Sequence, residues 1–180
     1  MQGKKRMTIL IVVVLLIAGL AVFVASRPDE FRVQRSALIQ APPAALFAQV
    51  NDFHQWPHWS PWARRDPAMR VEYEGAEQGV GAVQHWAGNK QVGKGSATIL
   101  ESVPGERVLI QLEFLEPFRA SNLAEFSFQP EASGTRVNWR MTGRNGFVGK
   151  AMGLVFDMDK MVGGDFEQGL QQLRMRVEES

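Results

Sequence analysis

The clearest helical pattern in the sequence lies in residues 155–177, which read VFDMDKMVGGDFEQGLQQLRMRV. Apolar side chains recur there every three or four residues, the spacing that places them on one face of an α-helix. They are Val155, Met158, Val162, Phe166, Leu170, Leu173 and Val177. The opposite face is polar and carries Lys160, Glu167, Gln171, Arg174 and Glu178. The pattern predicts one long amphipathic helix, with helical spacing that begins near residue 147.

Two adjacent glycines, Gly163 and Gly164, fall inside this helical pattern. An interior glycine costs a helix about 1 kcal/mol relative to alanine, so the pair is a locally weak point. Two interpretations stay open. The helix bends here as a lid that admits a ligand, or the glycines let the helix approach its partner closely.

The residues before this helix alternate between apolar and polar side chains, which is typical of half-buried antiparallel strands. The expected strands span residues 31–40, 69–74, 80–87, 95–102, 108–115, 124–129 and 136–141. The short connection Ala132-Ser133-Gly134 predicts that the last two strands form a hairpin. A short helix is expected over residues 44–50, followed by a tryptophan-rich loop or broken helix over 53–62.

These elements predict an α+β fold. A sheet with one apolar face needs a cover, and the C-terminal helix is the only large cover that the sequence offers. We therefore expect a curved antiparallel sheet of six to seven strands around the long helix, with space left between them. The domain is expected to span residues 31–180.

The N-terminal segment differs in composition from the rest of the chain. Three basic residues at 4–6 precede an uncharged run over 7–26, which as a helix would rise about 30 Å and cross a bilayer. We predict a basic cytoplasmic segment at 1–6, a single transmembrane anchor at 7–26 and a linker at 27–30. The positive charge before the anchor favours a cytoplasmic N-terminus and an extracytoplasmic domain. A cleaved signal peptide is the alternative.

The composition excludes several classes of protein. The chain contains no cysteine, which rules out disulfides, thiolate nucleophiles, zinc fingers and iron–sulfur clusters. Its net charge is +1, so no electrostatic feature points to nucleic acid as a partner. A hydrophobic fraction of 45% and a charged fraction of 22% are typical of a globular protein.

Several short motifs resemble those of the SRPBCC superfamily. They are Ala41-Pro42-Pro43, Val50-Asn51-Asp52-Phe53, Trp56-x-x-Trp59-Ser60-Pro61-Trp62, Gly79-Val80-Gly81-Ala82 before Trp86, and a closing run from Gly149 to Phe166 that is similar to a bacterial subgroup. Over residues 31–178 the chain resembles polyketide cyclase/dehydrase-type members, in the helix-grip fold shared with START lipid-transfer domains and the birch pollen allergen. This resemblance implies an internal apolar cavity for a lipid-like or polycyclic molecule.

The sequence contains no convincing catalytic, metal or cofactor motif. Residues 88–94 nearly match a phosphate-binding loop, but Gly95 stands where that loop has serine or threonine, and a hairpin turn explains the glycines. His54 and His58 have the spacing of two metal ligands on a helix, yet Pro57 lies between them. We therefore predict no catalytic residue, no metal ion and no cofactor.

The acidic residues of the C-terminal helix are expected on a solvated face. Asp157 and Asp159 are two apart and point about 200° away from each other, so they cannot hold one ion together. Asp165 is expected to share this solvated environment. His85 is a single histidine in a strand, and a structural role explains it better than catalysis.

The residues expected to line the cavity occupy strand faces and loops that point toward the long helix. They are Phe47, Trp59, Trp62, Tyr73, Trp86, Phe114, Asn122, Phe126, Trp139, Met141, Met152 and Phe156. Asn122 shares the parity of Phe126, so it could orient a ligand in the pocket or bond to neighbouring backbone. All of these positions also suit packed core.

The pattern and the resemblance together predict non-covalent binding of a small hydrophobic ligand by a membrane-anchored domain. One alternative is a cyclase-type enzyme that uses an acid or base on a polyketide or steroid, but strand parity directs the charged side chains outward: Glu113, Glu125, Arg136 and Arg140. The other is a structural or partner-binding module with a collapsed cavity. A cavity of about 300–1,000 Å³ would separate the binder from the collapsed module.

The location can be tested directly. If the uncharged run is an anchor, the mature chain stays in the membrane fraction, and residues 31–180 are accessible from the extracytoplasmic side. N-terminal sequencing of the mature protein is the check. A mature sequence that starts near Arg27 would show that the run is a cleaved signal peptide.

Overall fold

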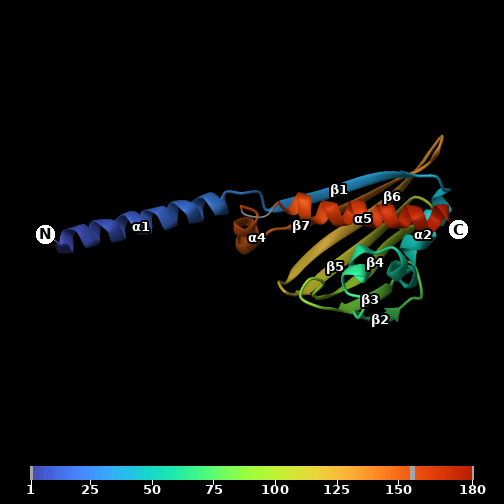
Figure 1. Cartoon of the computed structure of the whole chain (residues 1–180), viewed down its shortest axis with the longest axis horizontal. Coiled ribbons are helices and arrows are strands. Elements are labelled where there is room, and N and C mark those ends of the chain that lie inside the picture. Colours follow the sequence, from blue (N-terminus) through green and yellow to red (C-terminus); the bar gives the residue numbers. More distant parts are fainter. Residues whose placement is uncertain (1, 155–156, 180) are drawn as a thin grey trace.

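The computed structural model describes residues 2–154 and 157–179, so Val155 and Phe156, which the sequence places on the helical stripe and in the cavity, lie outside the described residues. The helices are α1 (Gln2–Ala25), α2 (Pro43–Asn51), the 3-10 helix η1 (Phe53–His58), α3 (Pro61–Arg65), α4 (Phe147–Met152) and α5 (Met158–Glu178). The strands are β1 (Glu30–Ile39), β2 (Arg70–Gly75), β3 (Ala82–Ala87), β4 (Lys94–Val103), β5 (Arg107–Glu116), β6 (Ala120–Glu131) and β7 (Gly134–Arg144). Figure 1 shows the strands curving around α5, while α1 extends away from the domain. The expected α+β helix-grip architecture is confirmed.

The seven strands form one antiparallel sheet in the order β1-β7-β6-β5-β4-β3-β2. The first strand therefore pairs with the last one, and the order then runs back through the sequence to the edge strand β2. The predicted hairpin is confirmed, because Glu131 of β6 pairs with Gly134 of β7. Gly134 has a φ of +145°, which favours glycine at this turn.

The inner face of the sheet carries the hydrophobic core. On β6 and β7 the buried residues alternate with more exposed ones, and Phe126 lies directly opposite Trp139. On the outer face Arg140 donates a hydrogen bond to Glu125 at 2.7 Å. Strand parity therefore places the large apolar side chains inside and the charged ones outside, as the alternation predicts.

The C-terminal helical region consists of two helices, so the expectation of one uninterrupted helix is wrong. α4 ends at Met152, and Gly153 is its C-cap residue. α5 begins at Met158, where the Asp157 side chain accepts a hydrogen bond from the backbone N–H of Lys160 at 3.1 Å. This cap satisfies one of the free N–H groups at the start of α5 and fixes where the helix begins.

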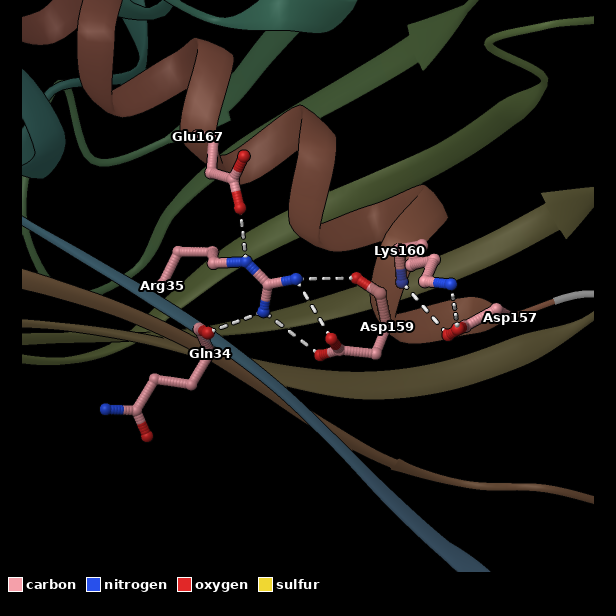
Figure 2. Close-up of polar contacts among 6 residues, drawn as sticks. All are labelled: Gln34, Arg35, Asp157, Asp159, Lys160 and Glu167. Atoms are coloured by element: carbon pink, nitrogen blue, oxygen red, sulfur yellow. Dashed lines mark hydrogen bonds and ion pairs between the residues drawn. The ribbon is translucent and has the colours of Figure 1, made fainter.

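An ion-pair clamp holds the first half of α5 against β1 (Figure 2). Arg35 donates hydrogen bonds to Glu167 at 2.6 Å and to the carboxylate and carbonyl of Asp159 at 2.9–3.0 Å. These bonds, with Asp159 first, raise the pKa of Arg35, and they lower the pKa of Asp159. A Cβ at Gly163 would overlap the guanidinium, whereas Gly164 faces open space. Because α5 continues through both glycines, Gly163 serves close packing.

α1 is the one helix in the described part of the chain that is long and apolar enough to cross a membrane, over Lys5–Ala25. Most of its apolar side chains are exposed, and its last turn contacts α4, where Val24 is buried. Lys150 of α4 donates a hydrogen bond to the carbonyl of Ala25 at 3.1 Å and forms an ion pair with Asp29. The hydrogen bond from Lys150 lowers the pKa of Asp29. These contacts join the end of α1 to the domain.

The two glycines of α5 are expected to respond differently to alanine. Gly164→Ala should stabilise the full-length protein in detergent by up to about 1 kcal/mol, because alanine is the better helix former and finds open space. Gly163→Ala should be less stable than Gly164→Ala by about 1–3 kcal/mol, because the new Cβ displaces Arg35.

Urea unfolding measures this difference, and Arg35→Ala supplies the control. In that background the two alanine variants should become nearly equally stable, since no guanidinium remains to be displaced. Equal stability of the two variants in the wild-type background would contradict the close-packing interpretation.

Candidate ligand cavity

A partly open apolar cavity of about 180 Å³ lies between the inner face of the sheet, α5 and the segment that contains η1 and α3. Its lining residues are Trp56, Ser60, Trp62, Met69, Gln84, Trp86, Val92, Ala97, Leu112, Phe114, Ala124, Trp139, Met141, Val162, Asp165 and Phe166. The volume lies below the expected range of about 300–1,000 Å³. The cavity is thus smaller than the sequence interpretation required for a binder, but side chains do not fill it.

Small residues on the sheet create this space. Ala97 of β4 and Ala124 of β6 are buried at positions that point inward, and both line the cavity. Gly95 lets the Trp86 ring lie across β4, since a Cβ there would approach Trp86 Cη2 to 2.6 Å. The Trp86 ring in turn meets the edge of Phe114 at a centroid distance of 5.7 Å. Large rings therefore form one wall of the cavity, and alanines leave its interior empty.

The floor of the cavity is a packed aromatic cluster. Trp139 of β7 stacks on Phe166 of α5 with ring centroids 4.1 Å apart and planes 7° apart. Trp59 packs against Trp139 at 5.8 Å and against Phe126 at 6.0 Å. The indole N–H of Trp59 donates to the carbonyl of Gln49 at 3.1 Å, which ties the loop to α2. Trp59 therefore anchors the tryptophan-rich segment in the core.

Two buried polar atoms of the lining residues have no hydrogen-bond partner among the described residues. They are Oε1 of Gln84 and Nε1 of Trp139. Gln84 is 8% exposed and Trp139 is 2% exposed, so both side chains are shielded from bulk solvent. One atom is an acceptor and the other a donor. Unpaired buried groups of this kind are costly, so they mark a place where a ligand could supply the missing bonds.

A buried carboxylate also faces the cavity, and the expectation that Asp165 lies on a solvated face is wrong. Asp165 is 8% exposed and lines the cavity from α5. Burial raises the pKa of Asp165, although Arg65 of α3 forms an ion pair with it and opposes the shift. The apolar lining thus contains one acid whose neutral form is favoured more than usual.

The structure brings five of the twelve expected cavity residues together around this space: Trp62, Trp86, Phe114, Trp139 and Met141. Two others, Trp59 and Phe126, lie in the packed core beneath it. Phe47 packs on Phe128 at 6.1 Å, and Tyr73 stacks on His54 at 4.0 Å. Met152 is exposed on α4, and Phe156 lies outside the described residues.

Asn122 points inward as its parity predicts, but it contributes to a second hollow. This hollow of about 560 Å³ lies among β1, β5, β6 and β7 and is broad, open and partly lined by charged residues such as Glu30 and Arg144. Oδ1 of Asn122 is buried without a partner among the described residues, and Nδ2 lies 3.9 Å from Met141 Sδ. The smaller cavity is the candidate site, because it is the more enclosed of the two and mostly apolar.

Eleven lining residues were not among the expected cavity residues: Trp56, Ser60, Met69, Gln84, Val92, Ala97, Leu112, Ala124, Val162, Asp165 and Phe166. Strand parity contains a signal for Gln84, which is two residues before Trp86 and therefore on the same face. Helix spacing contains a signal for Asp165, which is three residues after Val162 on the apolar stripe. Both were overlooked because polar side chains are usually solvated.

The other motifs have structural roles. The glycine-containing segment 88–93 is the turn between β3 and β4, which confirms the hairpin interpretation, and Lys94 pairs with Glu116 at 2.9 Å. His54 Nδ1 lies 2.9 Å from the Asp52 carboxylate, and His85 lies 3.2 Å from Glu74 on the exposed side of the sheet.

The fold and the cavity define a helix-grip domain with an internal apolar pocket. The chain belongs to the family described as polyketide cyclase / dehydrase and lipid transport, whose model matches residues 30–178. It is thereby a member of the SRPBCC superfamily, and the family supports a domain of the hydrophobic ligand-binding or cyclase type. No curated protein matches the chain.

Solved structures show the same fold at low sequence identity. Protein CV1439 from Chromobacterium violaceum is 18% identical with a TM-score of 0.60, covering 84% of this chain and 99% of that one. The di-domain ARO/CYC StfQ from the steffimycin biosynthetic pathway is 11% identical with a TM-score of 0.63, covering 84% of this chain and 51% of that one. Ara h 8.0201 is 13% identical with a TM-score of 0.59, covering 84% and 99%.

The raised pKa of Asp165 predicts a pH-dependent stability. The folded protein binds the Asp165 proton more tightly than the unfolded chain does, so protonation of Asp165 stabilises the folded state. This stabilisation is fully present below the ordinary pKa of about 3.9 and is lost as pH rises through the raised pKa. The difference in unfolding free energy between wild type and Asp165→Asn should therefore fall as pH increases through this window. Denaturant titrations at a series of pH values measure it.

Asp159→Asn is the matched control on the same helix. The hydrogen bond from Arg35 lowers the pKa of Asp159, so the difference between wild type and this variant should rise with pH. Slopes of the same sign for the two variants would contradict the assignment of Asp165 as the buried acid.

Proposed function

We propose that this chain is a membrane-anchored protein that binds one small, largely apolar molecule bearing a hydrogen-bonding group. The observation that supports this most is the pair of unpartnered polar atoms, Gln84 Oε1 and Trp139 Nε1, on residues that line the apolar cavity. Each unpaired group costs the folded protein about 1–3 kcal/mol. A hydroxyl or carboxamide on the ligand can both accept and donate, so it suits this pair of atoms.

The cavity size limits the apolar part of the ligand. Its volume of about 180 Å³ is close to that of an engineered cavity of about 150 Å³ that binds benzene. A body of one or two fused rings is therefore the expected size, and larger polycyclic molecules would need the rim to move. Burial would contribute about 2.5 kcal/mol for each 100 Å² of apolar ligand area.

The anchor is the second part of the proposal. The span Lys5–Ala25 is long enough for a bilayer, and its apolar side chains have no core to enter because they are exposed in the structure. The basic residues before the span favour an N-terminus in the cytoplasm, which leaves the domain on the extracytoplasmic side. The short linker keeps the domain at the membrane surface.

A cyclase-type enzyme is the second candidate, and Asp165 is the observation that favours it. Burial raises the pKa of the Asp165 carboxyl in this apolar cavity, which makes the group a better proton acceptor than an ordinary aspartate. The ion pair with Arg65 offsets part of this shift. If wild type but not Asp165→Asn accelerates deuterium exchange at the carbon next to the carbonyl of bound 2-tetralone, the site performs acid–base chemistry as well as binding.

The binding proposal is tested with 2-naphthol and naphthalene, two probes that share a ring system and differ by one hydroxyl. Full-length protein in detergent should bind both, and energy transfer from cavity tryptophans such as Trp139 reports the bound fraction. Gln84→Leu should weaken 2-naphthol by about tenfold, about 1.4 kcal/mol, relative to naphthalene, because the acceptor of the hydroxyl is lost.

Gln49→Leu is the matched control for this substitution. Oε1 of Gln49 is also buried without a partner among the described residues, but Gln49 does not line the cavity. This variant should bind the two probes as wild type does. Absence of saturable energy transfer with either probe in the wild type would contradict the proposed function.

A further inference from the structure

One end of the domain gathers the elements that lie nearest to α1, and we name it the α1 end. β1 begins there at Glu30, which pairs with Arg144 at the end of β7. The β5–β6 turn lies at the same end, because Asn122 near the start of β6 pairs with Gly143. α4 and the start of α5 also lie on this side of the sheet, next to α1 (Figure 1).

Large apolar side chains are exposed at the α1 end. They come from the β5–β6 hairpin, from α4, from the residues after α4 and from the first turn of α5, and they are Leu115, Phe118, Phe147, Met152, Leu154 and Met161. Single exposed apolar residues are normal on a protein surface. Six from several separate elements at one end instead form a surface suited to a membrane or another apolar partner.

The short connection between α1 and β1 determines which partner can contact this surface. The four residues 26–29 between α1 and β1 could span at most about 14 Å even if fully extended. The two ends of this connection lie closer together than full extension would place them, because Lys150 of α4 binds both the carbonyl of Ala25 and the carboxylate of Asp29. The bilayer that contains α1 is therefore within reach of the α1 end at all times.

The turn that carries Phe118 has the chemistry of an interfacial contact. Phe118 is 60% exposed, and Arg119 beside it is exposed as well. An aromatic ring next to a cation suits the boundary between acyl chains and anionic headgroups, where the ring enters the apolar layer and the cation stays at the headgroups. The surface therefore matches a lipid bilayer better than an apolar protein partner.

Part of the cavity rim lies at the same end. Its deepest residues, such as Trp139 and Phe166, are fully buried, whereas Val92, Phe114 and Val162 are half-buried. Val92 lies in the β3–β4 turn, and Phe114 pairs with Ala120 beside the β5–β6 turn. The turns of the α1 end and the start of α5 thus form part of the rim, and half-buried residues of α3 and of the segment after it form another part.

We infer that the α1 end rests on the bilayer that holds α1, and that the cavity exchanges its ligand directly with the lipid. The ligand is then a membrane-partitioned amphiphile that enters apolar part first or leaves into the acyl layer without crossing bulk water. This inference rests on the proposed function, since it requires both the anchor and the cavity. It adds the orientation of the domain and the source of the ligand.

The absence of cysteine allows a direct test of this orientation, because one introduced cysteine is labelled at a single site. Phe118→Cys and Val80→Cys are labelled with the fluorophore NBD in full-length protein reconstituted into phosphatidylcholine–phosphatidylglycerol vesicles. Val80 is a matched control. It is 59% exposed, and it follows Gly79, whose N–H binds the carbonyl of Asn51 at the opposite end of the sheet.

Doxyl-labelled lipid should quench the label at residue 118 several-fold more than the label at residue 80. Loading of 2-naphthol from the vesicles is then followed by stopped-flow energy transfer. The double variant Phe118→Asp/Phe147→Asp should load 2-naphthol several-fold more slowly from vesicles, while its affinity for the probe in detergent stays unchanged. Val80→Asp should change neither the loading rate nor the affinity.

The outcomes separate the two proposals. If wild type binds no 2-naphthol in detergent, the proposed function fails, and the inference fails with it. If wild type binds the probe but the two labels are quenched equally, the α1 end does not rest on the bilayer. If the aspartate pair loads as fast as wild type, the ligand does not come directly from the lipid.

Discussion

Stacking of Trp139 on Phe166 sets the position of α5 in the sheet, and the cavity depends on that position. The rings are nearly parallel at 4.1 Å, and Gly169 makes room for the indole, since a Cβ there would lie 2.6 Å from Trp139 Cζ3. This contact separates helix and sheet by the thickness of two rings. At Ala97 and Ala124 the side chains of the sheet are too small to fill this gap between helix and sheet. One packed contact thus produces both the core and the empty space beside it.

Most of the fold could be predicted from the sequence because its signals are local. Strand alternation and the helical stripe each depend on neighbours a few residues apart, so they identified the seven strands and the long C-terminal helix. The break between α4 and α5 was missed. It depends on the cap at Asp157 and on Gly153, and the apolar spacing continues across both. Local periodicity describes faces better than it describes ends.

The candidate site was less predictable. The alternation of residues along a strand tells which face of the sheet a side chain occupies, but it does not tell whether that position lies at the cavity or in the packed core. Trp59 and Phe126 are on the inner side, but at a level that rings already fill. Asp165 was missed for another reason. Its neutralising partner, Arg65, is a hundred residues away in sequence, and no local pattern reveals that pairing. Burial of a charge is decided by tertiary contacts, so sequence rules assign such a residue to the surface by default.

One end of the sheet is closely packed, whereas the other end carries part of the cavity rim. At the end opposite to α1, α2 and η1 cover the sheet, and Leu46, Val50 and Phe53 are almost completely buried there. That end supplies close packing of the kind that stabilises a protein core. At the α1 end, half-buried residues of the cavity rim stand in place of this close packing. Since apolar rim residues are stable only when water is kept from them, a bilayer at this end would complete the burial that the chain itself leaves unfinished.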